Sequence, residues 1–250
     1  MSDTLVVCHL GHEPYRRTWD LQNQIQRSVV DAKRAGRTPE HVLLSVEHAP
    51  VYTLGKSGDE NNLLVDEDWL AANGAELVRT DRGGDITFHG PGQIVLYPIL
   101  DLDQLFTDLG KYLRLLEQSV IDCLLMYGIT GSRVKGQTGV WLPKNKHQPE
   151  RKICAMGIHC SRWVTKHGLA VNVSTDLAYF ESIVPCGIAD KPVTSLSREL
   201  GRTVPLDEVR ERLVGHIVRQ FNLTLRQLHG REARDYIDEL TGETQPRSNG

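Results

Sequence analysis

Two short segments, KICAMGIHC at residues 152–160 and HGLAVNV at residues 167–173, decide the fold class. Each is a run of small and apolar residues that contains a glycine. Such near-continuous runs are typical of strands that are buried on both faces of a sheet. Three further segments have a similar apolar content, namely HVLLSVEH (41–48), IVLYPILDL (94–102) and TGVWLP (138–143). Together they predict a sheet that is covered, in places, on both faces.

Helical patterns lie between these strands. Residues 14–35 carry a mostly apolar stripe at helical spacing. Pro14 suits the first turn of a helix, and Gly36 suits its carboxyl end. Three more helices are expected at residues 65–74, 106–124 and 206–221. Because helices and strands are interleaved along the chain, we expect an α/β or α+β protein built on a sheet.

The length and the distribution of apolar residues bound the domain organisation. The chain has 250 residues, which fits one large domain or two small ones. No internal repeat is visible, and the last twenty residues lose apolar density. We therefore expect a single domain over residues 1–230. A tail over residues 231–250 would then be either an ornament or a disordered segment.

The composition excludes several classes of protein. A net charge of −3 offers no basic face for a nucleic acid. No apolar run approaches the roughly 18 residues that span a bilayer, and the amino-terminal residues lack the basic start of a signal peptide. Five cysteines are an odd number in a long chain, which favours free thiols and a reducing compartment. We expect a soluble cytoplasmic protein that binds neither membrane nor nucleic acid.

Three patterns could carry chemistry. The segment RGGDITFHGPGQ (82–93) has four glycines, which let a backbone approach a ligand closely but more often mark tight turns. Lys152 opens a predicted strand and, taken alone, is a charge at a strand edge. Cys186 stands between Pro185 and Gly187, a turn context that would present its thiol to a cleft, although most cysteines of cytosolic proteins are small buried hydrophobes. The chain contains no C-x-x-C or H-E-x-x-H pattern, so no metal site is expected.

In their order and spacing, four motifs resemble the octanoyltransferases of lipoate biosynthesis. These are R82-G-G-D-I-T-F-H-G-P-G-Q93, K152-I-C-A-M-G-I-H159, H167-G-L-A-V-N-V173 and P185-C-G-I188. The resemblance runs from about residue 40 to residue 200. It implies a mixed sheet flanked by helices, related to the catalytic domains of biotin and lipoate ligases. The segment 144–151, the tail after residue 230, Cys154 and Phe88 depart from the family pattern.

The resemblance also implies a reaction. An octanoyl or lipoyl group would pass from acyl carrier protein, through a thioester on Cys186, to a lysine of a lipoyl domain, with Lys152 as the partner of the cysteine. The acceptors would be lipoyl domains of 2-oxoacid dehydrogenase E2 subunits and the glycine cleavage H protein, and no cofactor is expected. The implied substrate-binding residues are Arg82, Gly83, Gly84, Asp85, Ile86, Thr87, Phe88, His89, Ala155, Met156, Gly157, Gly168, Leu169 and Ala170.

The chemistry accounts for these residue types. A thiolate is the nucleophile in thioester exchange, and a nearby ammonium lowers the pKa of a cysteine. Small side chains leave room for a straight acyl chain. Five basic residues on either side of the strand at 152–160 could form a docking patch for an acidic carrier protein, namely Lys144, Lys146, Arg151, Arg162 and Lys166. Two alternatives remain, an ATP-dependent lipoate or biotin ligase and a non-catalytic module that binds acyl chains or lipoyl domains.

Overall fold

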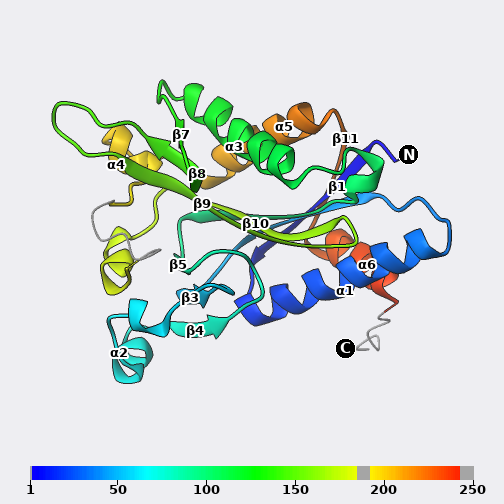
Figure 1. Cartoon of the computed structure of the whole chain (residues 1–250), viewed down its shortest axis with the longest axis horizontal. Coiled ribbons are helices and arrows are strands. Elements are labelled where there is room, and N and C mark those ends of the chain that lie inside the picture. Colours follow the sequence, from blue (N-terminus) through cyan, green and yellow to red (C-terminus); the bar gives the residue numbers. More distant parts are fainter. Residues whose placement is uncertain (1, 185–191, 243–250) are drawn as a thin grey trace.

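The computed structural model describes residues 2–184 and 192–242 (Figure 1). Its main feature is an eight-stranded sheet with the strand order β11-β1-β2-β6-β10-β9-β8-β7. The sheet is mixed, because β1 pairs in parallel with β2 and β11 while the other neighbours are antiparallel. The strands are β1 (Thr4–His12), β2 (His41–Glu47), β6 (Gln93–Ile99), β7 (Ser132–Val134), β8 (Gln137–Leu142), β9 (Arg151–Ser161), β10 (Val164–Asn172) and β11 (Thr224–His229).

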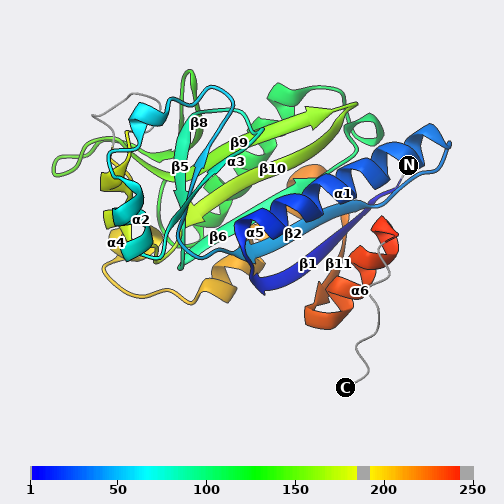
Figure 2. The same cartoon turned by 90° about the horizontal axis from the view of Figure 1, so that it is seen from below.

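Helices cover both faces of this sheet (Figure 1 and Figure 2). On one face lie α1 (Tyr15–Arg34) and α6 (Gly230–Thr241), and on the other lie α3 (Leu109–Leu125) and α5 (Leu206–Phe221). Successive residues of a strand point to opposite faces, so Val95 packs on the α1 side while Ile94 and Leu96 pack on the α3 side. Two buried faces explain why the strands read as continuous apolar runs.

A small second sheet, in the order β4-β3-β5, lies beside the amino-terminal end of α1 (Figure 1). It consists of β3 (Val51–Leu54), β4 (Glu76–Arg79) and β5 (Ile86–His89), with α2 (Glu67–Ala72) between β3 and β4. Tyr52, Phe88 and Ile183 belong to a separate apolar core beneath it. The remaining short elements are η1 (Glu60–Asn62), η2 (Leu102–Gln104), η3 (Leu177–Ser182) and α4 (Leu196–Leu200).

The predicted strands at 41–48, 94–102, 138–143, 152–160 and 167–173 and the four predicted helices are confirmed to within a few residues. The sequence patterns do not predict β1, β7, β11 or the small sheet. Within residues 2–184 and 192–242, no helix is long and apolar enough to cross a membrane.

The predicted tail needs a correction over its first part. Residues 230–241 form α6, which packs against β1 and α1 through the buried side chains of Ala233 and Ile237. A helix that buries a single narrow stripe needs few apolar residues, so low apolar density was a poor guide to order here. Residues 243–250 lie outside the described part of the chain, and the domain boundary at residue 230 stays a prediction.

Candidate active site

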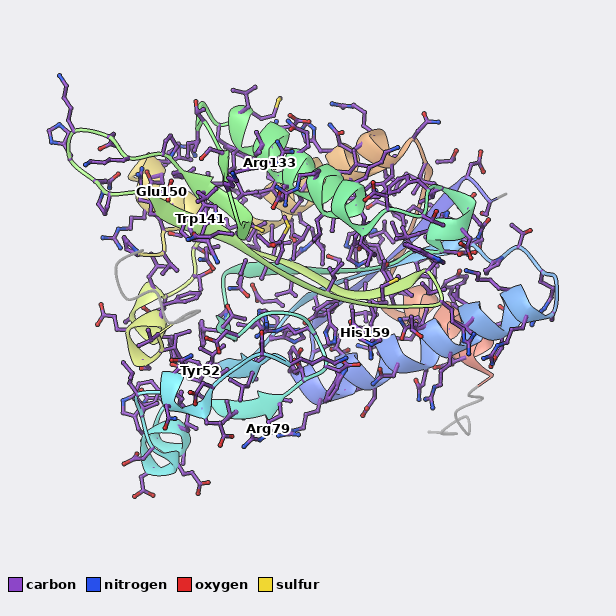
Figure 3. The ribbon with its side chains drawn as sticks, viewed as in Figure 1. Tyr52, Arg79, Arg133, Trp141, Glu150 and His159 are labelled. Atoms are coloured by element: carbon purple, nitrogen blue, oxygen red, sulfur yellow. The ribbon has the colours of Figure 1, made fainter. Side chains whose placement is uncertain are left out.

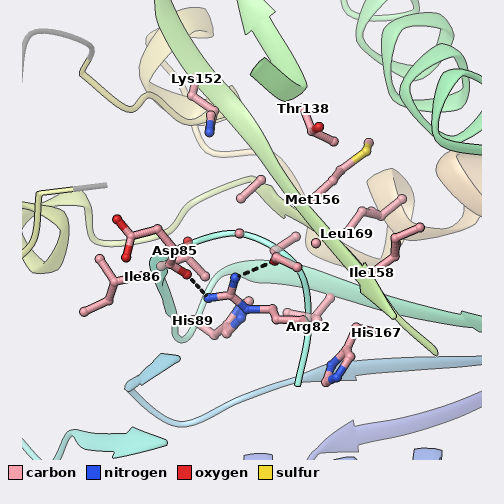
Figure 4. A pocket seen from close by; sticks show the side chains of 18 of the residues that line it. Arg82, Asp85, Ile86, His89, Thr138, Lys152, Met156, Ile158, His167 and Leu169 are labelled. Carbon is pink, nitrogen blue, oxygen red and sulfur yellow. Dashed lines mark hydrogen bonds between the residues drawn. The ribbon is translucent and has the colours of Figure 1, made fainter. Parts of the chain in front are cut away.

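A cavity of about 420 Å³ lies between the main sheet and the segment Arg82–His89 (Figure 4). The β9–β10 pairing sets Gly157 opposite Gly168 and Ala155 opposite Ala170, and all four residues line the cavity. Residues directly opposite in an antiparallel pair point to the same face. The pairing therefore places two glycines and two alanines side by side in the wall of the cavity.

All of the predicted substrate-binding residues except Phe88 line this cavity. Phe88 lies on β5 and is buried in the core of the small sheet, where its ring stacks on Tyr179 at 4.6 Å and meets Tyr52 at 5.3 Å. Its neighbours Thr87 and His89 both line the cavity. Phe88 differs from them because its ring packs against Tyr179 and Tyr52 in the core of the small sheet, which its place in the motif does not reveal.

The glycines of the Arg82 segment let it lie directly on β9. The amide of Gly83 donates a hydrogen bond of 2.9 Å to the carbonyl of Ile158. A Cβ atom on Gly157 would stand 2.7 Å from the carbonyl oxygen of Gly83, and a Cβ on Gly55 would stand 2.2 Å from that of Gly84. These separations are below van der Waals contact, so glycine is required where the backbones meet.

Arg82 is buried and holds the segment together from inside. Its Nη2 donates to Thr53 Oγ1 at 2.9 Å and to the carbonyl of Asp85 at 2.7 Å, and it also bonds the carbonyl of Thr53. Its Nε donates to Thr53 Oγ1 at 3.2 Å. One guanidinium group therefore ties β3 to the turn that precedes β5.

His89 is part of the wall of the cavity. Its Nδ1 lies 2.8 Å from Gln93 Oε1, and Gln93 donates in turn to Asn172 at 2.9 Å. Complete burial and the nearby His48 lower the pKa of His89 to about 3. The imidazole is therefore neutral at physiological pH and contributes shape and hydrogen bonds rather than charge.

Lys152 opens onto the same cavity near its β8 side (Figure 4). Its Nζ lies 4.6 Å from the centre of the Trp141 ring, a cation–π contact. Its backbone amide donates to the carbonyl of Pro192 at 2.9 Å, and its carbonyl accepts from Thr194 at 2.8 Å. Val193, between those two residues, also lines the cavity.

A buried ion pair fixes this junction. Arg151 Nε and Nη2 bond the two carboxylate oxygens of Glu199 at 2.6 and 2.5 Å, and Thr194 Oγ1 donates to the same carboxylate at 2.5 Å. Burial opposes ionisation of Glu199, but these hydrogen bonds outweigh it and hold the pKa of Glu199 below its ordinary value. The chain that returns at Pro192 is thereby joined to β9 beside Lys152.

Cys186, the predicted nucleophile, lies outside the described residues. The described residues stop at Val184, whose amide donates to the carbonyl of Asn62. They resume at Pro192, whose carbonyl accepts from the amide of Lys152. The other four cysteines are described as free thiols. Burial raises the pKa of Cys8 and of Cys123 to about 12, and it also raises the pKa of Cys154 and of Cys160. These four thiols are therefore poorly suited to form a thiolate.

The predicted docking patch is wrong as a single surface. β9 runs from Arg151 to Ser161, which at the rise of a strand is roughly 33 Å. Figure 3 shows Glu150, just before β9, and His159, near its other end, well apart. Lys144 and Lys146 precede one end, whereas Arg162 follows the other. Arg151 pairs with Glu199 and is largely buried, as is Lys166 in its pair with Asp81. These five basic side chains therefore do not lie together at one opening of the cavity.

Several lining residues were not predicted from the sequence. Gln93, Val95 and Tyr97 hold alternate positions on β6, and Asn172 continues the series of Gly168 and Ala170 on β10, so strand alternation could have found them. The others reach the cavity through tertiary packing that no local pattern reveals. They are Tyr15, Leu113, Gly136, Gln137, Thr138, Trp141, Ile158, His167, Phe180 and Val193.

Comparison with known protein families gives a match to the lipoyl protein ligase A/B catalytic domain over residues 14–218. An octanoyltransferase of Flavobacterium psychrophilum is 51% identical over 233 residues, which cover 90% of this chain and 100% of that protein. An octanoyltransferase of Chloroflexus aggregans is 46% identical, covering 88% of this chain and 96% of that protein. The resemblance seen in the four motifs is thereby confirmed over most of the chain.

Solved structures agree on the fold. A bipartite lipoate protein ligase from Thermoplasma acidophilum superposes with a TM-score of 0.67 at 19% identity, covering 99% of both chains. The biotin protein ligase from Aquifex aeolicus superposes with a TM-score of 0.51 at 14% identity, covering 87% of this chain and 70% of that one. The expected mixed sheet flanked by helices, related to the ligase catalytic domains, is confirmed.

Proposed function

Because the chain belongs to the lipoyl protein ligase A/B catalytic domain family and its relatives at about half identity are octanoyltransferases, we infer that it is an octanoyltransferase of protein lipoylation. It moves an octanoyl group, or a lipoyl group, from acyl carrier protein to a lysine of a lipoyl domain. The acyl group passes through a thioester on Cys186, and Lys152 is the partner of that cysteine.

One observation supports this function above the others. Lys152 opens onto the same cavity as the small residues Ala155, Gly157, Gly168 and Ala170. A cation beside small apolar residues suits an acyl thioester, whose reacting carbonyl must be near charged groups while its methylenes are buried. Each buried methylene stabilises binding by about 0.8 kcal/mol, so the methylenes of an octanoyl group give the cavity a substantial hold on the chain.

The reaction has two steps, acylation of Cys186 and transfer of the acyl group to the acceptor lysine. In the first, the Cys186 thiolate attacks the carbonyl carbon of the octanoyl thioester, the new C–S bond forms, and the pantetheine thiolate leaves with a proton from Lys152. In the second, the amine of the acceptor lysine attacks the acyl-enzyme. The amide bond forms, the Cys186 thiolate leaves, and the proton lost by the amine goes to Lys152.

The neighbourhood of the predicted pair supports this assignment. The segment that contains Cys186 rejoins the described chain at Pro192, whose carbonyl accepts from the backbone of Lys152. Phe180 before the segment and Val193 after it both line the cavity. The four other cysteines have raised pKa values, which leaves them weak nucleophiles.

The partners follow from the reaction and belong to the same proposal. The donor is octanoyl-acyl carrier protein, and the acceptors are lipoyl domains of 2-oxoacid dehydrogenase E2 subunits and the glycine cleavage H protein. An odd number of cysteines in a long chain favours a reducing compartment, so the enzyme would act in the cytoplasm.

The decisive experiment separates a transferase from a ligase. Purified protein is mixed with octanoyl-acyl carrier protein and an unmodified lipoyl domain, without ATP or Mg²⁺, and amide formation is followed by mass spectrometry. We expect complete transfer, because the thioester is already activated. An absolute requirement for ATP, or transfer from free octanoate only, would assign the protein to the ligase class.

A further inference from the structure

Lys152 reaches the cavity because β9 carries one extra residue directly after it. In the β8–β9 pairing Val140 stands opposite Cys154. The next residue of β8, Trp141, stands opposite Lys152, so Ile153 is the extra residue of a β-bulge. A bulge interrupts the alternation of side chains along a strand and re-aims one of them. Cys154 accordingly packs in the core on the α3 side, whereas Lys152, two residues earlier, opens onto the cavity.

The same bulge places the ring of Trp141 beside the ammonium group. The backbone amide and carbonyl of Lys152 bond Pro192 and Thr194, so both point away from β8. Trp141 and Lys152 are therefore a cross-strand pair of the kind that has no hydrogen bonds between its members and whose side chains approach most closely. Nζ of Lys152 lies 4.6 Å from the centre of the ring, which is 3% exposed. A cation over an indole face is attracted to it, and more strongly where water is excluded.

The start of β8 is fixed to α3 as well as to β9. Glu117 of α3 is fully buried and accepts from the amide of Gly139 at 3.0 Å. The same carboxylate pairs with Arg114 and Arg133, each at 3.0 Å. Gly139 has φ of 120°, and a Cβ atom there would overlap the carbonyl oxygen of Cys154. These contacts hold β8 in the register that the bulge requires.

An aromatic ring is well suited to hold this ammonium group. The proposed reaction needs the charge of Lys152 near the Cys186 thiolate, and it needs a proton for the leaving thiolate. A carboxylate in place of the ring would also hold the ammonium, but its negative charge would raise the pKa of the cysteine and oppose the thiolate. The ring has no net charge, so it restrains the flexible four-carbon stem of the lysine without that cost.

We propose that Trp141 is the positioning residue of Lys152, and that the face of its ring keeps the ammonium group directed into the cavity for acyl transfer. The inference rests on the proposed function, because the transfer reaction is what requires an ammonium group at this place. Trp141 acts through Lys152 and not on the reacting atoms. The bulge at Ile153 and the bond from Gly139 to Glu117 belong to the same arrangement, since they set the ring opposite the lysine.

Fluorinated tryptophans test this role with little change in shape, because each fluorine withdraws negative potential from the face of the ring. Tryptophan and its mono-, di-, tri- and tetrafluoro analogues are incorporated at position 141 of the full-length protein. Transfer from octanoyl-acyl carrier protein to a lipoyl domain is then measured. We expect kcat to fall stepwise with the number of fluorines, by about tenfold in total. KM should stay within about twofold, because the ring acts on Lys152 and not on the substrate.

Two further comparisons separate the face of the ring from its bulk. The same fluorinated series at Trp163, an exposed residue between β9 and β10, is the control and should show no trend. Trp141→Phe keeps a smaller ring face and should lose no more than about threefold in kcat, whereas Trp141→Leu removes the face and should lose about thirtyfold. Equal losses in the two variants would reduce Trp141 to a packing residue and overturn the proposal.

Urea denaturation tests the contact with Lys152 independently of activity. Each fluorine changes packing equally in the unaltered protein and in Lys152→Met, so the difference between their urea midpoints isolates the contact between ring and ammonium. That difference should shrink as fluorines are added at position 141. A constant difference, or a kcat that does not depend on the number of fluorines, would overturn the proposal. If the unaltered protein transfers no octanoyl group at all, it is the proposed function that fails, and the urea series still decides whether the ring holds the ammonium.

Discussion

Two cationic residues line the same cavity, and the structure treats them in opposite ways. Arg82 is 7% exposed, and its guanidinium group donates hydrogen bonds to Thr53 and to the backbone carbonyl of Asp85, so it stabilises the wall of the cavity. Lys152 is half-buried, its ammonium lies over the ring of Trp141 in the cavity, and its backbone bonds to Pro192 and Thr194. A charged residue of a motif can therefore stabilise the wall of a site, as Arg82 does, or be placed to take part in its chemistry, as we propose for Lys152.

The largest effect should come from removing the charge at Lys152. Lys152→Met should lower kcat by about 10²- to 10⁴-fold, because the proton relay and the stabilisation of the thiolate are both lost. The pKa of Cys186 should rise, since a nearby ammonium lowers the pKa of a thiol. The measurements are the transfer rate and the pH dependence of alkylation of Cys186.

Stability is the control for that variant. The free energy of unfolding of Lys152→Met should lie within about 1 kcal/mol of that of the unaltered protein, because methionine keeps the apolar stem of the side chain. Lys144→Met, in the loop before β9, should change neither activity nor stability. An unshifted alkylation profile in Lys152→Met would remove Lys152 from the role of partner and erase the contrast with Arg82.

The next effect should appear in stability at Arg82. Arg82→Met removes the buried hydrogen bonds of the guanidinium group to Thr53 and to the carbonyl of Asp85, and we expect a loss of about 2–4 kcal/mol in the free energy of unfolding. Urea denaturation measures it. Arg79→Met is the matched control, because Arg79 is exposed and pairs with Glu60 on the surface, and it should cost at most about 0.5 kcal/mol. Equal effects of the two variants would contradict the structural role of Arg82.

The sequence predicts most strands of the main sheet and both cationic residues of the site, but not the contacts that give those two residues different roles. The strands β2, β6, β9 and β10 can be predicted from their apolar runs because both faces of those strands are buried. β5 was hidden by the glycines around it. Phe88 was grouped with the cavity because a motif does not show which face each residue takes, and the role of Arg82 depends on Thr53, which is far away in the sequence.

A smaller effect should follow from adding a methyl group at Gly157, where the Arg82 segment lies on β9. Gly157→Ala would place a Cβ atom 2.7 Å from the carbonyl oxygen of Gly83 and push the Arg82 segment away from β9. Such overpacking should lower kcat/KM about tenfold. Gly215→Ala on α5 meets no atom within 4 Å and should raise the free energy of unfolding slightly, by about 0.5–1 kcal/mol. Full activity in Gly157→Ala would show that the close approach of the two backbones is dispensable.

The smallest effect concerns the junction that holds the Lys152 end. Glu199→Gln should cost roughly 1 kcal/mol at neutral pH, because the hydrogen bonds from Arg151 and Thr194 lose their charged acceptor. The folded pKa of Glu199 lies below its ordinary value of 4.5, so this contribution is present above pH 4.5 and is lost as pH falls through the folded pKa. Unfolding curves of the two proteins should therefore converge on acidification. A difference that stays constant down to pH 3 would show that the ionised carboxylate is not what stabilises the junction.

The central claim is that the acyl group rests on Cys186, and the mass of the intact protein after mixing with octanoyl-acyl carrier protein tests it most directly. The unaltered protein and Cys160→Ala, which removes the most exposed of the other thiols, should each gain one octanoyl group that hydroxylamine removes. Cys186→Ala should gain none. An octanoyl adduct of the same stoichiometry on Cys186→Ala, or transfer by that variant at the rate of the unaltered protein, would contradict the account.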